Sequence, residues 1–158
     1  MEKEEVYLVL DNIRSVHNVG AIFRTADAAG ISKIYLCGYT PTPLDRFGRE
    51  RGDLAKAALG AEKTVPWESC ESTEEILEKL KKENVFLVAV EQSEDSTDYK
   101  KFRPSFPLAL VFGNELDGVS KEVLKKCDVV LDIPMRGSKE SLNVSVSLGI
   151  AVFRILNI

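Results

Sequence analysis

Two short, continuous apolar segments constrain the fold more than any other feature of this sequence. They are VFLVAV at residues 85–90 and LALVFG at residues 108–113. A strand with one face in water alternates apolar and polar residues, whereas a strand covered on both faces is apolar throughout. Both segments have the length of a strand, so they predict a parallel sheet with helices on both faces, as in α/β domains.

Further strand-like and helix-like segments alternate along the chain. Strands are expected at residues 6–11, 33–38, 85–90, 108–113 and 129–134. Helices are expected from Asn18 to a C-cap at Gly30, and at residues 53–59, 72–84, 120–127 and 141–156. Ser72, followed three residues later by Glu75, forms a capping-box pattern at one helix start. The predicted architecture is a single α/β domain over residues 1–158, with a mostly parallel sheet.

Length, charge and cysteine content narrow the class of protein. The 158 residues carry 21 Lys and Arg against 25 Asp and Glu, a net charge of −4. No run approaches the ~20 apolar residues of a membrane span, and the acidic N-terminus differs from a secretion signal. We therefore expect a cytoplasmic protein with no membrane partner. Three widely spaced cysteines and one histidine, His17, favour free thiols and no metal site.

The acidic charge is concentrated in one part of the chain. Residues 66–98 hold ten Asp or Glu and three Lys, a balance of −7, which leaves +3 for the remainder. The basic residues of segment 45–63 include Arg46, Arg49 and Arg51. Their spacing would suit a phosphate backbone. Carboxylates lie among them, so a solvated loop with paired charges is the alternative.

Polar, glycine-containing segments follow three predicted strands, at the edge where parallel α/β sheets bind ligands. They are VEQSE (90–94), GNELDG (113–118) and IPMRGSKES (133–141). Gly113 would let a ligand approach the backbone, and Gly118 would permit a tight turn. A strand-to-helix turn with Glu115 as a capping acid is the alternative. Neither GxGxxG nor GxxxxGK[ST] is present, so the common dinucleotide and triphosphate sites are not predicted.

Two helical segments carry residues that packing alone does not explain. Arg24 interrupts the small and apolar NVGAIFRTADAA, so it is either an edge residue reaching water or a functional residue. The closing segment places Ser141, Asn143 and Ser145 in its predicted first turn, with Ser141 and Ser145 on one face. N-capping accounts for only one of these three residues.

The segments NVGAIFRTA, VFGNELDGVS and IPMRGSKESLNVSVSLGIA resemble, in this order, the three motifs of the SpoU/TrmH family. Members are knotted (SPOUT) RNA 2'-O-ribose methyltransferases that use S-adenosylmethionine. The resemblance spans about the whole chain and covers no accessory RNA-binding domain. It implies a C-terminal trefoil knot, a tRNA or rRNA substrate, and a homodimer formed through the closing helix.

The resemblance also implies roles for individual residues. Arg24 would act on the ribose 2'-hydroxyl and a neighbouring phosphate. The full catalytic set would be Arg24, Asn18, Glu115, Ser141 and Asn143. Backbone groups of three loops would hold the methyl donor, at Val90, Glu91, Gly113, Ile133, Met135 and Leu142. RNA would contact Arg46, Arg49 and Arg51, and no metal would take part. Ser147 stands where many relatives have alanine, and this departure from the family pattern concerns dimer packing rather than the reaction.

Two alternatives stay open at this stage. The first is a non-catalytic RNA-binding or assembly protein with the same knotted fold, which the presence of Arg24, Glu115 and Asn143 disfavours. The second is a nucleotide-binding or other small-molecule α/β domain unrelated to RNA, which the net negative charge supports.

Overall fold

The computed structural model describes residues 4–158 and contains a seven-stranded sheet in which all neighbouring strands are parallel. The strands are β1 (Val6–Asp11), β2 (Lys33–Cys37), β3 (Trp67–Cys70), β4 (Phe86–Val90), β5 (Thr97–Asp98), β6 (Leu108–Gly113) and β7 (Val129–Asp132). Their order is β3-β2-β1-β6-β4-β7-β5. The predicted α/β class is confirmed, and the sheet is parallel throughout rather than mostly parallel.

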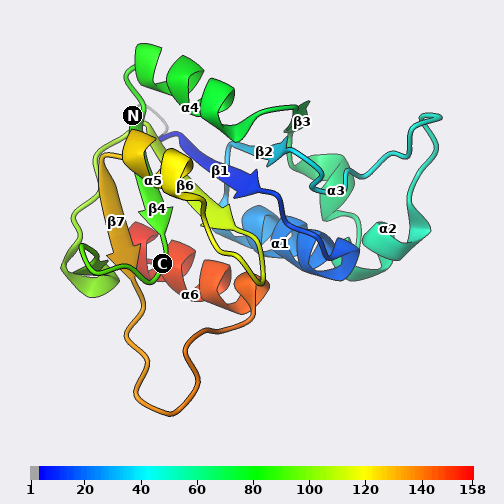
Figure 1. Ribbon diagram of the computed structural model, residues 1–158. Helices are drawn as coiled ribbons and strands as arrows, with labels where there is room; N and C mark the ends of the chain where they lie inside the picture. Colours follow the sequence, from blue (N-terminus) through cyan, green and yellow to red (C-terminus); the bar gives the residue numbers. More distant parts are fainter. Residues whose placement is uncertain (1–3) are drawn as a thin grey trace.

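Helices cover both faces of this sheet, as expected (Figure 1). One face packs against α1 (Val16–Ala29), α2 (Gly52–Ala58), α3 (Ala61–Thr64) and α6 (Val144–Leu156). The other face packs against α4 (Thr73–Lys82) and α5 (Lys121–Lys126). A short 3-10 turn, η1 (Tyr99–Lys101), follows β5.

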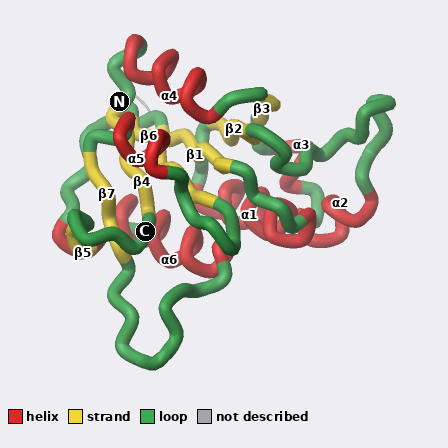
Figure 2. Tube along the Cα trace, in the orientation of Figure 1, coloured by secondary structure: helices red, strands yellow, loops and turns green. Residues whose placement is uncertain are grey.

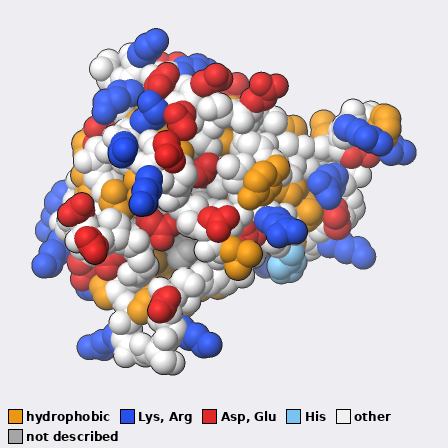
Figure 3. Space-filling model, in the orientation of Figure 1, with side chains coloured by type: hydrophobic (Ala, Val, Ile, Leu, Met, Phe, Trp, Pro, Cys, Tyr) orange, Lys and Arg blue, Asp and Glu red, His pale blue; other side chains and the backbone are white. Residues whose placement is uncertain are grey.

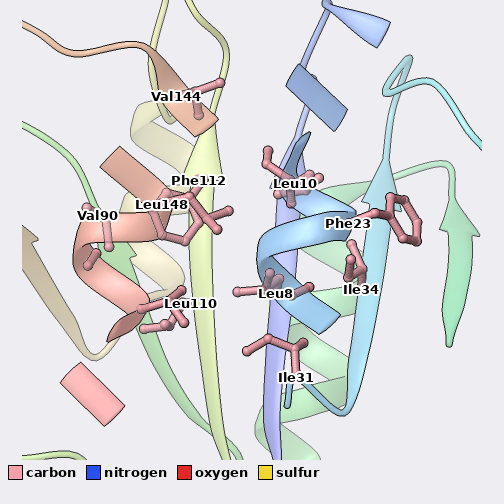
Figure 4. Packing of buried hydrophobic residues seen from close by; sticks show 14 of the residues in the cluster. Leu8, Leu10, Phe23, Ile31, Ile34, Val90, Leu110, Phe112, Val144 and Leu148 are labelled. Atoms are coloured by element: carbon pink, nitrogen blue, oxygen red, sulfur yellow. The ribbon is translucent and has the colours of Figure 1, made fainter. Parts of the chain in front are cut away.

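The continuous apolar strands supply a core on each side of the sheet. Leu8 and Leu10 of β1 belong to the cluster under α1 and α6, whereas Val9 between them belongs to the cluster under α4. Figure 4 shows the first cluster, with side chains of β1 and β6 directed at the two helices. Burying one such side chain contributes about 1.5–3 kcal/mol, so both layers stabilise the sheet.

Local signals define the first helix. The Ser15 hydroxyl accepts a hydrogen bond from the Asn18 amide at 3.1 Å, which caps the start of α1 two residues before the expected position. Gly30 ends the helix with a φ of 73°, as predicted. A Cβ on Gly20 would lie 2.6 Å from the Leu54 carbonyl oxygen, so glycine is needed where α1 packs closely on α2.

The closing helix begins later than the sequence pattern suggested. Asn143 is its N-cap and its side-chain oxygen accepts from the Ser145 amide at 2.9 Å, so α6 starts at Val144. Ser141 lies in the preceding loop. The prediction that Ser141 and Ser145 share a helix face is therefore wrong, because a strong N-cap at Asn143 stops the helix from extending backward.

The strands that pattern reading missed are the two edges of the sheet, β3 and β5 (Figure 2). Both are short, and their sequences, WESC and TD, lack the continuous apolar character of the central strands. After β7 the chain leaves the sheet in a long loop and returns as α6 (Figure 1). The trefoil knot in this region stays a prediction.

Candidate active site

The loops that follow β4, β6 and β7 enclose a cavity of about 680 Å³, its open mouth included. All six residues expected to hold the methyl donor line this cavity: Val90, Glu91, Gly113, Ile133, Met135 and Leu142. Glu115 and Ser141, expected in the catalytic set, line it as well. The structure therefore brings together three segments that are far apart in sequence, at the carboxyl edge of the strands.

The cavity suits an organic ligand with apolar and polar parts. Ligand sites in proteins combine mostly apolar walls with a few polar groups that fix the orientation of the ligand. Phe112, Ile133 and Met135 supply apolar surface. Among the described residues, the backbone N–H groups of 135–142 donate to no other backbone group, and Met135, Ser141 and Leu142 of this segment line the cavity.

The carboxylate of Glu91, in the loop after β4, binds the loop after β6 (the β6 loop). The Glu91 side chain accepts hydrogen bonds from the Val119 amide at 2.8 Å and the Gln92 amide at 2.9 Å. Gly118 has a φ of 68°, and a Cβ there would lie 2.3 Å from a Glu91 carboxylate oxygen. The predicted tight turn at Gly118 is confirmed, and Glu91 holds it in place.

Packing within the protein, rather than a ligand, requires glycine at position 113. A Cβ at this position would lie 2.3 Å from the Gly118 carbonyl carbon and 2.3 Å from the Val119 nitrogen. The sequence suggested that a ligand needs this space. The structure gives a different reason, because the β6 loop folds back over its own strand end.

Asn18, Glu115 and Asn143 form one hydrogen-bonded network. The Glu115 carboxylate accepts from the backbone amides of Arg14 and Ser15 at 2.9 and 2.8 Å, and from the Asn18 side chain at 3.2 Å. The Asn143 side chain donates to the Asn18 side-chain oxygen at 3.1 Å. The network joins the start of α1, the β6 loop and the start of α6.

The electrostatics of Glu115 keep it ionised. Partial burial raises the pKa of this carboxyl, but the hydrogen bonds from Arg14, Ser15 and Asn18 outweigh burial and hold the pKa below its usual value. A carboxylate with several N–H donors is an acceptor that positions backbone. This geometry assigns Glu115 to holding loops together.

Arg24 is exposed on α1 and does not line the cavity of its own chain. Its neighbour Thr25 faces α6, with its methyl carbon 3.9 Å from where a Cβ on Gly149 would lie. Arg24 itself lies on the exposed side of α1. Within one chain, the structure separates Arg24 from the other residues of the expected catalytic set.

Arg46, Arg49 and Arg51 gather on an arm between β2 and α2, on the right of Figure 1. Figure 3 shows basic and hydrophobic side chains together at the end of this arm. Asp45 pairs with Arg49 at 3.0 Å and Asp53 with Arg51 at 3.3 Å. The expected RNA-binding residues are therefore close together but outside the cavity.

Pattern reading missed several residues that belong to the site. Phe112, Asn114 and Leu116 line the cavity beside Gly113 and Glu115. Asn114 lies within the quoted GNELDG segment, so its position was a usable signal. The amides of Arg14 and Ser15 carry no such signal, because any residue except proline supplies a backbone donor.

Metal and redox groups are not assembled in the part of the chain that the structure describes. Residues 4–158 contain no cluster of three or more His, Cys, Asp or Glu side chains able to hold a metal ion. The three cysteines are free. Burial raises the pKa of the Cys127 thiol to about 12, which disfavours the reactive thiolate. No helix within 4–158 combines the length and apolar character needed to span a membrane.

Comparison with known proteins decides the family. The model described as the SpoU rRNA Methylase family matches residues 5–153. The chain belongs to this family. The 23S rRNA (guanosine-2'-O-)-methyltransferase RlmB of Escherichia coli K12 is 36% identical over 146 residues, which cover 92% of this chain and 57% of that protein. This SpoU-family chain thus spans less than three fifths of that relative.

Solved structures show the same fold. An rRNA methyltransferase from Sinorhizobium meliloti, solved with AdoMet bound, matches with a TM-score of 0.86 and 30% identity over 98% of this SpoU-family chain and 57% of its own. A structure described as giving insight into 2-OH methylation of C/U34 on tRNA matches with a TM-score of 0.81 and 27% identity. That match covers 96% of this chain and 94% of the other.

Proposed function

We propose that this SpoU-family chain transfers a methyl group from S-adenosylmethionine to the ribose 2'-hydroxyl of a nucleotide in tRNA or rRNA. One observation carries the proposal above the others: the six residues expected to hold the methyl donor line a single cavity. The RlmB relative, named a 23S rRNA (guanosine-2'-O-)-methyltransferase, supports the reaction type. The AdoMet (S-adenosylmethionine) bound in the Sinorhizobium structure supports the identity of the methyl donor.

The residues of the cavity fit this donor. Apolar side chains such as Ile133 and Met135 suit the flat face of adenine. The backbone amides of Ser141 and Leu142, which donate to no other backbone group, suit its polar edge. Bound there, S-adenosylmethionine supplies an electrophilic methyl group on a positively charged sulfur. The ribose oxygen forms the new bond to carbon as the carbon–sulfur bond breaks, and the hydroxyl proton leaves to a base or to solvent.

Arg24 is proposed to align the ribose. An arginine guanidinium stays protonated in proteins, so it is a poor base, but it forms paired hydrogen bonds with phosphate and with an adjacent oxygen. Alignment of this kind can reach effective molarities of ~10⁵ M or more. Asn18, Glu115 and Asn143 then act by holding the loops, and Ser141 lies at the cavity where ribose or phosphate would enter.

A homodimer completes the proposed site. Arg24 does not line the cavity of its own chain, so a second chain must supply the guanidinium. Val146, Ile150 and Phe153 form an apolar stripe along α6 and are 49%, 38% and 36% exposed. Their spacing places them on one face of the helix, and Arg24 lies on the neighbouring helix. This stripe is the proposed dimer contact.

The remaining expectations follow from the proposed reaction. We expect residues 1–158 to act as one methyltransferase domain with a trefoil knot, as the match over 94% of the tRNA-related structure supports. The same match makes tRNA the first substrate to test. Because tRNA and rRNA are abundant in the cytoplasm, we propose that the enzyme acts there.

An Arg24→Ala variant tests the function. Calorimetry should show unchanged binding of S-adenosylmethionine, whereas transfer of tritiated methyl groups to separated tRNA and rRNA fractions should fall at least ~100-fold. Arg103→Ala, at an exposed arginine before β6, is the matched control and should retain full transfer.

The outcomes separate the alternatives. Full turnover by Arg24→Ala would remove Arg24 from the mechanism. RNA binding without S-adenosylmethionine binding would favour the non-catalytic alternative. Absence of both RNA binding and methyl transfer at low salt would favour the alternative of a small-molecule-binding domain unrelated to RNA.

A further inference from the structure

The arm between β2 and α2 is held in one conformation by its own hydrogen bonds. One carboxylate oxygen of Asp45 accepts from the Phe47 amide at 2.8 Å and the Arg49 amide at 3.0 Å. Leu44 and Glu50 pair as an antiparallel bridge, and the Arg51 amide donates to the Pro43 carbonyl at 2.9 Å. These contacts fix the tip of the arm before any partner binds.

Phe47 is presented to solvent at this tip. Its side chain is 65% exposed, and the guanidinium carbons of Arg46 and Arg49 lie 4.8 and 4.9 Å from the ring centre. A rigid loop that exposes an aromatic ring to water gains nothing in core burial. An aromatic side chain between two arginines is the combination that binds stacked bases and their phosphates.

The inner side of the arm is a basic and aromatic groove. The groove encloses about 850 Å³, open mouth included. Its lining includes Tyr39, Phe47 and three arginines, of which Arg49 pairs with Asp45 and Arg51 with Asp53. Arg46 forms no ion pair within residues 4–158, so its charge is available to a phosphate. The groove therefore complements an anionic chain that carries flat bases.

The groove adjoins the cavity proposed for the methyl donor. The Asn114 side chain donates a hydrogen bond to the Tyr39 hydroxyl at 2.9 Å. Tyr39 lines the groove and Asn114 lines the cavity. A chain of nucleotides lying in the groove would consequently pass the edge of the cavity.

We propose that this groove binds an unpaired stretch of RNA next to the methylated nucleotide, with a base stacked on Phe47. The inference rests on the proposed function. Bases inside a duplex have both faces covered by neighbouring bases, so only an unpaired base offers a free face to the ring. As RNA binds, one guanidinium leaves the ring for a phosphate, where the paired, charge-assisted contact is stronger than an exposed cation–π contact.

Binding of a labelled 12-nucleotide single strand and of the matching duplex, measured by fluorescence anisotropy at low salt, tests the proposal. The single strand should bind more tightly than the duplex. Phe47→Leu should weaken single-strand binding by roughly 5- to 100-fold and leave duplex binding unchanged. Phe47→Trp, which keeps an aromatic face, should retain single-strand binding within about twofold.

Leu59→Ala is the matched control, because Leu59 is also 65% exposed but lies outside the groove. It should leave both affinities unchanged. Equal binding of single strand and duplex, or single-strand binding by Phe47→Leu at the wild-type level, would overturn the inference. So would a shift of the monomer–dimer equilibrium in Phe47→Leu without loss of RNA affinity, because the arm would then be a contact between subunits.

The methyl-transfer assay distinguishes this inference from the function on which it rests. If wild-type protein methylates RNA but Phe47→Leu binds single strands normally, the groove proposal fails and the function stands. If wild-type protein binds single strands through Phe47 but methylates no RNA, the proposed reaction fails.

Discussion

The side-chain amide of Asn143 donates to the side-chain oxygen of Asn18 at 3.1 Å, although 125 residues separate the two in the chain. The same Asn143 side chain caps α6 through its oxygen. One residue thus sets the start of α6 and ties it to α1, while Glu115 ties α1 to the β6 loop.

The two roles of Asn143 can be separated by substitution. Asn143→Ala loses both the cap and the link to Asn18, and should lower the free energy of unfolding by about 1–2 kcal/mol. Asn143→Asp keeps the capping oxygen but faces the Asn18 oxygen with a second acceptor. Urea unfolding should therefore show a smaller stability loss for Asn143→Asp, with methyl-donor binding reduced in both. Equal stability of Asn143→Ala and wild type would contradict the network.

Gly113 and Gly137 offer a matched pair of glycine substitutions near the cavity. A Cβ on Gly113 would lie 2.3 Å from backbone atoms of Gly118 and Val119, whereas a Cβ on Gly137 would have nothing within 4 Å. Gly113→Ala should lower stability by about 1–3 kcal/mol and weaken binding of S-adenosylmethionine, because the β6 loop must move. Gly137→Ala should stay within about 0.5 kcal/mol of wild type. Thermal unfolding measures stability and calorimetry measures binding. If Gly113→Ala were as stable as wild type and bound S-adenosylmethionine normally, the β6 loop would be able to move aside at no cost, contrary to the prediction.

Glu115 should make stability depend on pH. Burial raises the pKa of its carboxyl, but the hydrogen bonds from Arg14 and Ser15 lower it by more, so the folded pKa lies below the usual value. A depressed folded pKa contributes stability above the unfolded pKa of ~4.3, and that contribution is lost as pH falls through the folded pKa.

Glu115→Gln removes this pH dependence. Wild type should exceed Glu115→Gln by about 1–3 kcal/mol at pH 7, and the difference should shrink below pH ~4.3. Urea unfolding of the two proteins from pH 7 to pH 3 measures it, because the other carboxylates are common to both. A constant difference across this range would show that Glu115 does not titrate in linkage with folding.

A single charged substitution in the apolar stripe on α6 tests the proposed dimer. Ile150→Glu should convert the proposed dimer to monomer, because a charge cannot be buried unpaired at an apolar contact. The fold should persist, since Ile150 is partly exposed in the single chain. Sedimentation velocity measures the change, with Lys82→Glu on the exposed side of α4 as the control. A wild-type monomer at micromolar concentration would count against the dimer.

The central strands could be predicted almost residue by residue. Residues 108–113 coincide with β6 and residues 6–11 with β1, because a strand buried on both faces leaves an unmistakable apolar run. The edge strand β5, only Thr97–Asp98, leaves no such run and is defined by its pairing with β7. Edge strands of this kind depend on tertiary context more than on their own composition.

That the loops after β4, β6 and β7 meet at one cavity was also predictable, but the hydrogen bonds that hold these loops were not. Parallel strands place their carboxyl ends together, so the loops at Glu91, Gly113 and Ile133 had to meet. The partners of Glu115 are backbone amides about 100 residues away, and a backbone amide has no sequence signature. The start of α6 was misplaced because Ser141 and Asn143 are both good caps, and only packing chooses between them.

The pairing of β1 with β6 has a consequence for how the protein is made. Val6 pairs with Leu108, so β1 is synthesised about 100 residues before the central strand β6 that lies beside it. Until β6 is made, the edge of β1 that pairs with it stays open, although β2 can cover the other edge, and such long-range pairing slows folding and favours aggregation. A nascent chain stalled before residue 108 therefore lacks the middle of its sheet, and chaperones that shield apolar segments should act on it during translation.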